Sequence, residues 1–542
     1  MSGDIQIPIP VNEPVLDYAP GSPERRRLKD VLRSQSGETI EIPLVIGGQE
    51  VRTGDTVRAV MPHRHGHVLG TWHKAGRQEV ARAIDAAEHA WKEWSRWPWK
   101  ERAAVFLRAA ELLATRWRAR VNAATMLSQS KTVHQAEIDS AAELIDFFRF
   151  NAHFAERLYE DQPLSDAGIW NRMEFRPLEG FVYAVTPFNF TSIAGNLPGA
   201  PALMGNTVIW KPSSASVYSS YYVYRVLEAA GLPPGVINFL PGNPVEITEV
   251  VLDHPGFAGL HFTGSTSVFR QIWKTVGDRV ARYRNYPRLV GETGGKDFIV
   301  AHPSAQPQAL TTAILRGAFE YQGQKCSAVS RVYVPESLWT TIGDDLLQQT
   351  ADIPMGDIAD FRNFMGAVIN EEAYKKITGY VDDARRSSDA DILVGGEAEA
   401  SAGWFIRPTV IQAKRPDFRT MCEEIFGPVV SLYVYPDDQW SETLDLVDRT
   451  SPYALTGAVF AEERDAVQEA LSVLRYAAGN FYINDTPTGA VVGQQPFGGS
   501  RASGTNDKAG SMLNLVRWVS ARAVKETFVP PADYRYPFMQ AE

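Results

Sequence analysis

A regular alternation of short apolar runs with helix-length segments, beginning near residue 180, constrains the fold more than any other feature of the sequence. Each run ends in a turn with proline, glycine or a hydroxyl side chain, and the intervening segments, such as 216–230, are long enough for helices. Strands that alternate with helices at this spacing form a parallel sheet with both faces covered. Ligands of such sheets bind where the strands end. We therefore predict a cofactor-binding domain built on the runs 181–185, 207–210, 236–240 and 259–262.

A second α/β series after residue 300 predicts a separate catalytic domain. Its apolar runs are 331–334, 409–411, 429–435, 457–460 and 479–483. Upstream of both series, apolar residues recur at intervals of three and four over 78–92, 100–121 and 137–158, which predicts long helices. Residues 1 to about 45 contain several prolines and little periodicity, so we expect an extended arm there.

Composition and charge exclude several classes of function. The 542 residues carry a formal net charge of −10, whereas a protein that binds nucleic acid usually presents a basic face. No apolar run approaches the ~20 residues that span a bilayer, so we expect no membrane partner. Residues 1–20 resemble neither a signal nor a transit peptide, and two cysteines cannot form a disulfide framework. We therefore expect a cytoplasmic protein that acts on a small molecule.

Cys326 is the candidate nucleophile. It lies in the glycine-bearing stretch 323–327, just before an apolar run, so a turn would expose its thiol to a substrate. A buried structural cysteine is the commoner fate of a single cysteine. Glu292 and Asn189 argue against that alternative here, because they would add a base and an amide donor to the nucleophile.

A histidine-rich stretch raises the question of a metal. His63, His65 and His67 would lie on one face of a strand, but Pro62 and Gly66 mark a turn and no acidic or cysteine ligand is near. We predict no metal site.

The cofactor site does not follow the usual dinucleotide pattern, because the chain contains no Gly-x-Gly. The replacement candidate is the strand end at 262–266, where Gly264 permits a tight turn and Ser265 begins a helix whose dipole favours a pyrophosphate. Serine at such a position is more often only a helix cap. Lys211, at another strand end, can bind ribose hydroxyls or lie in solvent. Ser214 carries no charge to repel a 2′-phosphate, which leaves NADP as a weaker alternative to NAD.

The candidate residues fall within seven short motifs. In order they are Pro187-Phe188-Asn189-Phe190, Lys211-Pro212-Ser213, Phe262-Thr263-Gly264-Ser265, Glu292-Thr293-Gly294-Gly295-Lys296, Gly323-Gln324-Lys325-Cys326, Glu424-Ile425-Phe426-Gly427-Pro428 and Pro496-Phe497-Gly498-Gly499. This series resembles the aldehyde dehydrogenase superfamily, over roughly residues 45–525. Segments 190–196, 488–499 and 502–508 further resemble the branch of the family that oxidises L-glutamate γ-semialdehyde to glutamate, the second step of proline breakdown. Thr293, where the commoner motif has leucine, is usual in that branch.

The resemblance implies an aldehyde dehydrogenase fold, with two Rossmann-like parallel-sheet domains and a small β-flap for oligomerisation. The expected divisions are an arm at 1–45, an NAD-binding domain at 46–160 and 181–294, a flap and C-terminal segment at 161–180 and 505–530, and a catalytic domain at 295–504. A homodimer or a multiple of dimers is expected.

The resemblance also implies roles for individual residues. Cys326 would attack the aldehyde, Asn189 and the Cys326 backbone N–H would bind the oxyanion, and Glu292 would activate water. NAD would be held by Thr186, Phe188, Lys211, Ser214, Gly264, Ser265, Thr266, Glu424 and Phe426. The substrate would be held by Phe190, Ser327, Gly489, Ala490 and Phe497, although core packing is the commoner fate of phenylalanine.

Three alternatives remain. The chain could be an aldehyde dehydrogenase with another substrate. A CoA-acylating enzyme would resemble the family but lack the base at Glu292. A catalytically idle protein on this fold would have lost Cys326, Glu292 or Asn189, and all three are present.

Overall fold

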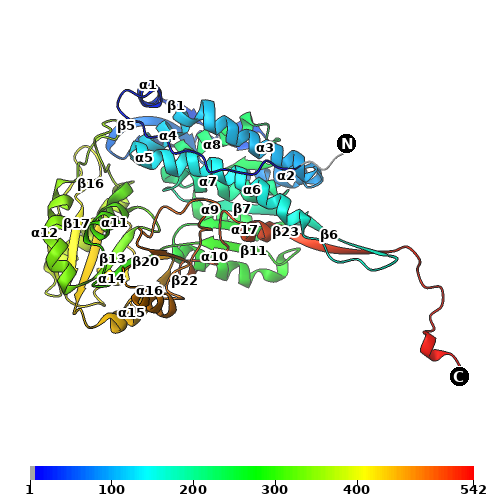
Figure 1. The fold of residues 1–542 in the computed structure, drawn as a ribbon. Helices are drawn as coiled ribbons and strands as arrows, with labels where there is room; N and C mark the ends of the chain where they lie inside the picture. Colours follow the sequence, from blue (N-terminus) through cyan, green and yellow to red (C-terminus); the bar gives the residue numbers. More distant parts are fainter. Residues whose placement is uncertain (1–5) are drawn as a thin grey trace.

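The computed structural model describes residues 6–542, in which two seven-stranded sheets lie side by side (Figure 1). The first sheet is parallel except at β2 and β3, which join it antiparallel at one edge. Its strands, in spatial order, are β11 (Arg288–Glu292), β10 (Phe257–Thr263), β7 (Phe181–Val185), β8 (Thr207–Lys211), β9 (Ile237–Phe239), β2 (Leu44–Ile46) and β3 (Gln49–Val51).

Alternating side chains of the first sheet feed two separate cores, as the two-residue period of a strand requires. Phe181 and Tyr183 of β7 pack on one face against α2 (Arg77–Trp94), α9 (Pro244–Asp253) and α10 (Thr266–Asp278). Val182 and Ala184 pack on the other face. The helices there are α3 (Trp99–Leu112), α4 (Arg118–Gln129), α6 (Glu143–Glu160), α7 (Thr191–Leu203) and α8 (Val217–Ala229).

The second sheet repeats this layering. In spatial order it contains β14 (Ala390–Val394), β17 (Thr409–Ala413), β18 (Val429–Tyr435), β13 (Val329–Pro335), β12 (Asp297–Ala301), β20 (Thr456–Phe460) and β21 (Asn480–Ile483), with only β14 antiparallel. One face packs on α11 (Pro307–Phe319) and α12 (Glu336–Asp352), and the other on α15 (Trp440–Arg449) and α16 (Arg464–Val473). The edge near β14 is covered by α13 (Glu371–Arg386).

A two-stranded ribbon projects from the body, and the C-terminal tail continues beyond it (Figure 1). It consists of β6 (Ile169–Pro177) and β23 (Val519–Thr527), paired antiparallel along their full lengths. The two strands fall within the segments 161–180 and 505–530, and the assignment of those segments as an oligomerisation flap stays a prediction.

The remaining elements are short or connect the layers. The strands are β1 (Ile40–Ile42), β4 (Thr56–Met61), β5 (Arg64–His73), β15 (Ala398–Glu399), β16 (Phe405–Ile406), β19 (Tyr453–Ala454) and β22 (Ser500–Arg501). The α-helices are α1 (Pro23–Gly37), α5 (Val133–Ala136), α14 (Arg419–Cys422) and α17 (Met512–Leu515). Two π-helical turns are η1 (Leu113–Trp117) and η2 (Glu137–Ala142), and the 3₁₀ turns are η3 (Ser214–Ser216), η4 (Val280–Arg282), η5 (Glu320–Gly323), η6 (Val516–Trp518) and η7 (Pro537–Met539).

The structure corrects two expectations about the N-terminal half. Residues 1–5 of the expected arm lie outside the described residues, and the rest is not extended throughout, because α1 forms with Ser22 as N-cap and Pro23 in its first turn. The helix expected over 100–121 is interrupted by the π turn η1. No helix of the described residues is long and apolar enough to cross a membrane.

Candidate active site

Cys326 lies in the turn between η5 and β13, facing the first sheet. The turn is strained, because Tyr321 and Gln322 have φ angles of +49° and +56°, in the left-handed region. Gly323 is required at φ +65°, where a Cβ atom would lie 2.2 Å from the Gly427 carbonyl oxygen. The cysteine itself is 9% exposed, so its thiol is reached only through the interior of the site.

The strain in this turn is balanced by hydrogen bonds from Gln322 to two other segments. Its Nε2 donates to the Ser130 carbonyl at 3.1 Å and to the Ala367 carbonyl at 2.7 Å. Its Oε1 accepts from the Gly366 N–H at 3.1 Å. The turn that carries the thiol is therefore held rigidly, as a preorganised nucleophile requires.

Glu292 faces the thiol from the carboxyl end of β11. Its Oε1 lies 3.8 Å from the Cys326 Sγ, within reach of an S–H hydrogen bond. Burial raises the pKa of Glu292 to about 7, and the Cys326 hydrogen bond and the charge of Lys508 only partly oppose this rise. A carboxyl group with a pKa near neutrality can take up and release a proton at physiological pH.

The strand end that carries Glu292 is fixed by the segment 502–505. Thr293 N–H donates to the Ser503 carbonyl at 2.9 Å, and its hydroxyl donates to the Ala502 carbonyl at 2.6 Å. On the other side of Glu292, the Thr505 N–H donates to the Gly291 carbonyl at 2.9 Å. The hydroxyl of Thr293 thus has a structural use that a leucine could not serve.

The surroundings of the Cys326 thiol disfavour its ionised form. Burial raises the pKa of Cys326, and the nearby charge of Glu292 raises it further, whereas a hydrogen bond from the Ser327 backbone N–H opposes the rise. Since the thiolate is the nucleophile, a base must take the proton. Glu292 is the carboxylate in hydrogen-bond contact with it.

Asn189 completes the cluster from the loop after β7. It is 4% exposed, and its Nδ2 donates to the Gln324 carbonyl at 3.0 Å, two residues before the nucleophile. An amide nitrogen carries two hydrogens, so one remains for another acceptor. The structure therefore brings Cys326, Glu292 and Asn189 together, from three distant parts of the chain.

The expected cofactor residues gather at the carboxyl ends of β7, β8 and β10. Lys211 ends β8 and is 6% exposed, and within residues 6–542 its ammonium group has no hydrogen-bond or ion-pair partner. Burial alone lowers the pKa of Lys211 to about 8. An unpartnered buried ammonium group fits a ligand that supplies hydroxyl oxygens. Thr186 follows β7, and its hydroxyl accepts from Trp210 Nε1 at 3.0 Å.

The start of α10 has the geometry of both a cap and an anion site. The Ser265 Oγ accepts from the Val268 N–H at 3.4 Å, a long capping bond. Thr266 Oγ1 accepts from the Gly294 N–H and donates to the Ala502 carbonyl, both at 3.3 Å. Gly264 has no room for a side chain, because a Cβ atom would lie 2.8 Å from the Phe262 ring. Ser214 lies in η3 and is exposed.

Glu424 and Phe426 approach the same region from the second sheet. The Glu424 carboxylate accepts from the Gly295 N–H at 2.9 Å, and a Cβ atom on Gly294 would lie 2.6 Å from it. Phe426 has a φ of +62°, and its ring meets Phe188 edge-on with centroids 5.8 Å apart. A cradle of glycine backbone, a carboxylate and two rings suits a ribose and a flat heterocycle.

The expected substrate residues form a second cluster beside the thiol. Ser327 Oγ lies 2.7 Å from Thr488 Oγ1, which ties the nucleophile turn to the segment that contains Gly489 and Ala490. Within residues 6–542, the backbone N–H groups of Gly489 and Ala490 donate to no acceptor. Gly489 has a φ of +90° and is exposed. Two free, adjacent N–H groups are suited to bind a carboxylate.

Two aromatic residues were also expected beside the substrate. The ammonium group of Lys131 lies over the Phe190 ring, 4.5 Å from the ring centroid. Phe497 lines a cavity with Glu292 and pairs through backbone hydrogen bonds with Ala509.

Sequence reasoning missed the polar residues behind Glu292. The same cavity is lined by Glu292, Glu143, Lys508 and Phe497. Burial raises the pKa of Glu143 to about 8, and Lys508 Nζ donates to the Gly479 and Gly498 carbonyls at 2.8 and 3.0 Å. Helical periodicity placed Glu143 in a helix but gave no signal that it faces the site.

The histidine-rich stretch has ordinary structural partners. His65 and His67 bond the Ala400 and Ser36 carbonyls at 2.9 and 2.8 Å, and His63 lies 3.8 Å from Asp357. Among the described residues, no group of three or more metal-binding side chains is arranged to hold an ion.

The comparisons with known proteins agree with this geometry. Residues 50–522 match the model of the aldehyde dehydrogenase family, and the chain belongs to that family. It is 52% identical to the mitochondrial Δ1-pyrroline-5-carboxylate dehydrogenase of Dictyostelium discoideum, over 98% of this chain and 96% of the relative. The corresponding human mitochondrial protein is 50% identical over 98% of this chain and 94% of the relative. A Mycobacterium tuberculosis structure of this dehydrogenase bound with NAD superimposes with a TM-score of 0.97 and 55% identity, with complete coverage of both chains.

These names contradict the cytoplasmic location expected from the sequence. The relatives from Dictyostelium discoideum, Bos taurus and human are all named mitochondrial enzymes. The expectation depended on residues 1–20, which do not resemble a transit peptide, and on cysteine usage, which distinguishes reducing from oxidising surroundings and does not separate one reducing compartment from another.

Proposed function

We propose that this chain oxidises L-glutamate γ-semialdehyde, derived from Δ1-pyrroline-5-carboxylate, to L-glutamate with NAD. The observation that carries the proposal is the juxtaposition of two clusters. Cys326 Sγ lies 3.8 Å from a base at Glu292, and the adjacent Ser327 is bonded to Thr488, which precedes two backbone N–H groups that have no acceptor within residues 6–542. The first cluster suits aldehyde chemistry, and the second suits a carboxylate at the far end of the substrate.

The reaction begins when Cys326 adds to the aldehyde carbon. Glu292 takes the thiol proton, the C–S bond forms, and the carbonyl oxygen becomes an oxyanion. The free N–H of Asn189 Nδ2 and the Cys326 backbone N–H donate to this oxyanion. In other enzymes the loss of one such donor costs ~2.7–4 kcal/mol in the transition state, so Asn189 contributes more than its neutral side chain suggests.

The second half of the reaction releases the acid. When bound, NAD accepts the hydride that leaves the tetrahedral carbon, and a thioester remains on Cys326. Glu292 releases the proton that it took from the thiol to solvent and then removes a proton from water, which attacks the thioester carbon; the C–S bond breaks and Cys326 leaves as the thiolate. The presence of this base favours hydrolysis over transfer of the acyl group to a thiol cofactor.

The proposed cofactor residues bind NAD through three parts of the site. Lys211 and Glu424 bind ribose hydroxyls, the start of α10 at Gly264, Ser265 and Thr266 receives the pyrophosphate, and Phe426 limits the position of the nicotinamide. Thr186, Phe188 and Ser214 line the same strand ends.

The proposed substrate residues select an amino acid with a short chain. Gly489 and Ala490 donate their N–H groups to the α-carboxylate together with the Ser327 hydroxyl. Phe190 and Phe497 contact the aliphatic carbons.

A substrate panel tests the proposal. Purified protein should reduce NAD far faster with glutamate semialdehyde than with propanal, and NAD should be preferred to NADP. Equal rates with the two aldehydes would remove the substrate assignment and leave the enzyme class. A Cys326→Ala variant should bind NAD and show no turnover; residual turnover would contradict the nucleophile.

We also propose that the chain divides into domains at the expected boundaries and assembles through the ribbon as a homodimer or a multiple of dimers. An isolated two-stranded ribbon is marginally stable in water and has unpaired edges. Trp170 on the ribbon is 50% exposed, and the tail beyond it exposes large apolar residues, namely Phe528, Val529, Tyr534, Tyr536 and Phe538. A second copy would cover this surface. Light scattering of the full chain should give a multiple of 60.1 kDa; a monomer at micromolar concentration would contradict the proposal.

A further inference from the structure

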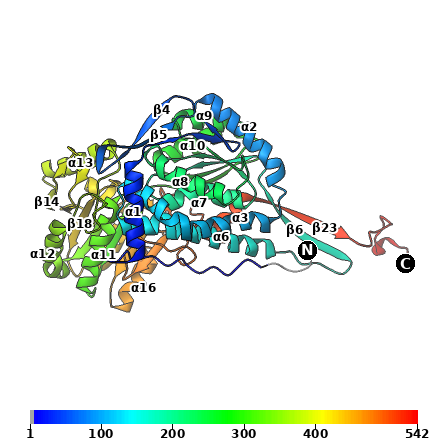
Figure 2. The same cartoon turned by 90° about the horizontal axis from the view of Figure 1, so that it is seen from above.

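The N-terminal arm, residues 6–18, crosses the helical layer without forming a regular element (Figure 2). It is held there by carboxylates instead of a strand partner. The backbone N–H groups of Ile7, Glu13 and Leu16 donate at 3.0, 2.7 and 3.0 Å to side-chain oxygens of the layer, which belong to Glu156, Asp146 and Glu137. All three acceptors are buried. Bonds to buried charged groups are stronger than ordinary ones, so the path of the arm is fixed.

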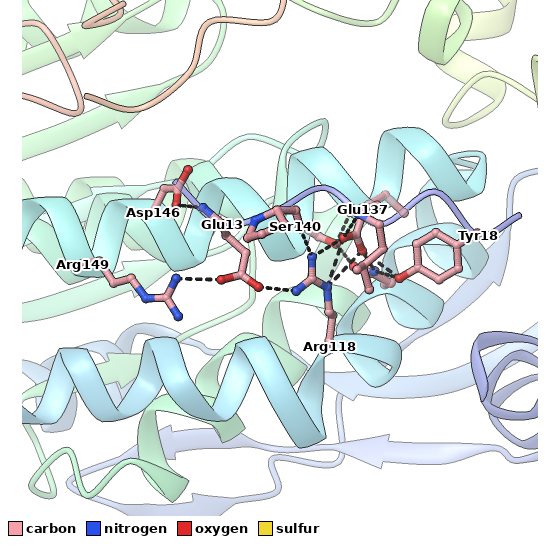
Figure 3. Close-up of polar contacts among 11 residues, drawn as sticks. Glu13, Tyr18, Arg118, Glu137, Ser140, Asp146 and Arg149 are labelled. Atoms are coloured by element: carbon pink, nitrogen blue, oxygen red, sulfur yellow. Dashed lines mark hydrogen bonds and ion pairs between the residues drawn. The ribbon is translucent and has the colours of Figure 1, made fainter. Parts of the chain in front are cut away.

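Charged side chains add to this fixation at the middle of the arm. Figure 3 shows the Glu13 carboxylate between Arg118 and Arg149, and the Arg149 contact measures 2.6 Å. Arg118 also donates to the Pro14 carbonyl at 2.7 Å. The residue just before Glu13 is therefore held at a defined position on the surface of α6.

Asn12, at that position, joins the helical layer to a distant loop. Its Nδ2 donates to Asp146 Oδ2 and to the Val492 carbonyl, both at 2.8 Å. Its Oδ1 accepts from Gln494 Nε2 at 2.9 Å. Every hydrogen of the amide group is thus used, and two of its three bonds reach the turn at 491–495.

The turn at 491–495 is compact and lies against α6. The N–H groups of Gln494 and Gln495 both donate to the Val491 carbonyl at 3.0 Å. A Cβ atom on Gly493 would lie 2.2 Å from the Phe150 ring, so the backbone meets the helix directly. The turn cannot shift toward α6, and Asn12 opposes its movement away.

The segment at issue, Gly489 and Ala490, spans the gap between two fixed points. On one side Thr488 is bonded to Ser327, beside the nucleophile. On the other side Val492 is bonded to Asn12. Between them, Gly489 is exposed and has no side chain to pack. The direction of its N–H group therefore depends on where the two ends are held.

We propose that Asn12 is a positioning residue for the substrate carboxylate, which it affects through the turn at 491–495 and without touching the substrate. The proposal rests on the function proposed above. With Asn12 in place, the segment that carries the N–H groups of Gly489 and Ala490 is held at both ends. Without it, the loop has to be ordered by the substrate itself, and affinity for the α-amino acid end falls.

Steady-state kinetics of Asn12→Ala in the full chain test this. The KM for glutamate semialdehyde should rise about tenfold, as expected for the loss of one or two hydrogen bonds to charged or preorganised groups. The kcat/KM for propanal, which has no carboxylate, should stay within about twofold, because the thiol and base are untouched. The Kd of NAD should not change.

Two further variants separate positioning from simple stability. Asn12→Asp keeps the volume but removes the donors, and it should match or exceed the KM change of Asn12→Ala; wild-type kinetics in Asn12→Asp would overturn the proposal. Glu156→Ala frees the arm at Ile7, far from the loop, and should lower the melting temperature without changing the KM.

The remaining outcomes are equally decisive. An unchanged KM for the semialdehyde in Asn12→Ala, or an equal loss with both aldehydes, would overturn the positioning role. Wild-type enzyme with no preference for the semialdehyde over propanal would instead refute the proposed function, before any variant is compared.

Discussion

Glu137 is fully buried and Glu292 is half-buried, and the surroundings of the two carboxylates are opposite. Glu137 accepts hydrogen bonds from Tyr18 and Asn122 at 2.7 Å and pairs with Arg118. Glu292 faces a thiol and a cavity, and no cation contacts it among the described residues. The comparison shows that burial alone does not define the role of a carboxylate. A carboxylate whose lone pairs are all occupied holds segments together, and one with unoccupied lone pairs can move a proton.

The largest effect is expected when the base of this pair, Glu292, is replaced. Glu292→Gln should lower kcat about 10³-fold, within the range for a general base, because no group remains to activate water. The melting temperature should hold or rise, since a neutral amide is cheaper to bury than a carboxylate. Rapid-mixing kinetics should also show a slower burst of NADH, because Glu292 takes the thiol proton before the thioester forms. An unchanged burst rate would confine the role of Glu292 to the hydrolysis step.

The converse change, Glu137→Ala, should damage stability and spare chemistry. It leaves the buried donors of Tyr18 and Asn122 without their acceptor, and an unsatisfied buried donor costs about 1–3 kcal/mol, while Arg118 keeps its pair with Glu13. Thermal and urea unfolding measure the loss. Activity per folded molecule toward propanal should remain near that of the wild type. A change in unfolding midpoint no larger than that of a surface variant such as Lys274→Ala would contradict the structural role.

The pH dependence of the reaction sharpens the comparison. Because the pKa of Glu292 is raised to about 7, the base is mostly protonated at pH 6 and ionised at pH 8, so kcat/KM should rise about tenfold across this range. Stability should change in the opposite sense. The folded state holds the Glu292 proton more tightly than the unfolded state, so the contribution of this residue to stability falls as pH rises from about 4.5 to about 7. A Glu292→Gln variant should lose this limb of the rate profile, and its persistence would assign the ionisation elsewhere.

The smallest effect is expected for a buried cation, Lys211, which can be compared with the buried Arg118. Lys211 is buried and has no partner among residues 6–542, whereas Arg118 pairs with Glu13 and Glu137. Lys211→Met should weaken NAD binding about fivefold, equivalent to roughly one hydrogen bond, and should leave stability unchanged or improved. Calorimetric titration with NAD measures the affinity. Unchanged affinity would mean that the ribose lies elsewhere.

The sequence predicted the elements whose patterns are local. β7 and β18 begin and end at the predicted residues, because apolar runs with a turn signal after them are unambiguous. β11 and β12 are as long as β7 but were not predicted as strands, because only the glycine-bearing link after Glu292 separates them. The helix α1 was missed although Ser22 and Pro23 provide a standard start signal.

Only the site residues that lie within sequence motifs could be predicted. Cys326, Glu292 and Asn189 could be named from the sequence, and their juxtaposition is a property of the fold. Asn12 and Glu143 could not be named, because neither lies in a recognisable motif. Their partners are set by tertiary packing, which a single sequence does not reveal.

The bond between Asn12 and Val492 joins positions 480 apart in the chain. A ribosome adds about 5–20 residues per second, so the beginning of the polypeptide waits roughly half a minute or longer for this partner to emerge. The other partners of the arm lie within residues 118–156, so they are made early and can hold Asn12 in place before the turn at 491–495 emerges. The newly made enzyme becomes selective for its substrate only when synthesis is nearly finished.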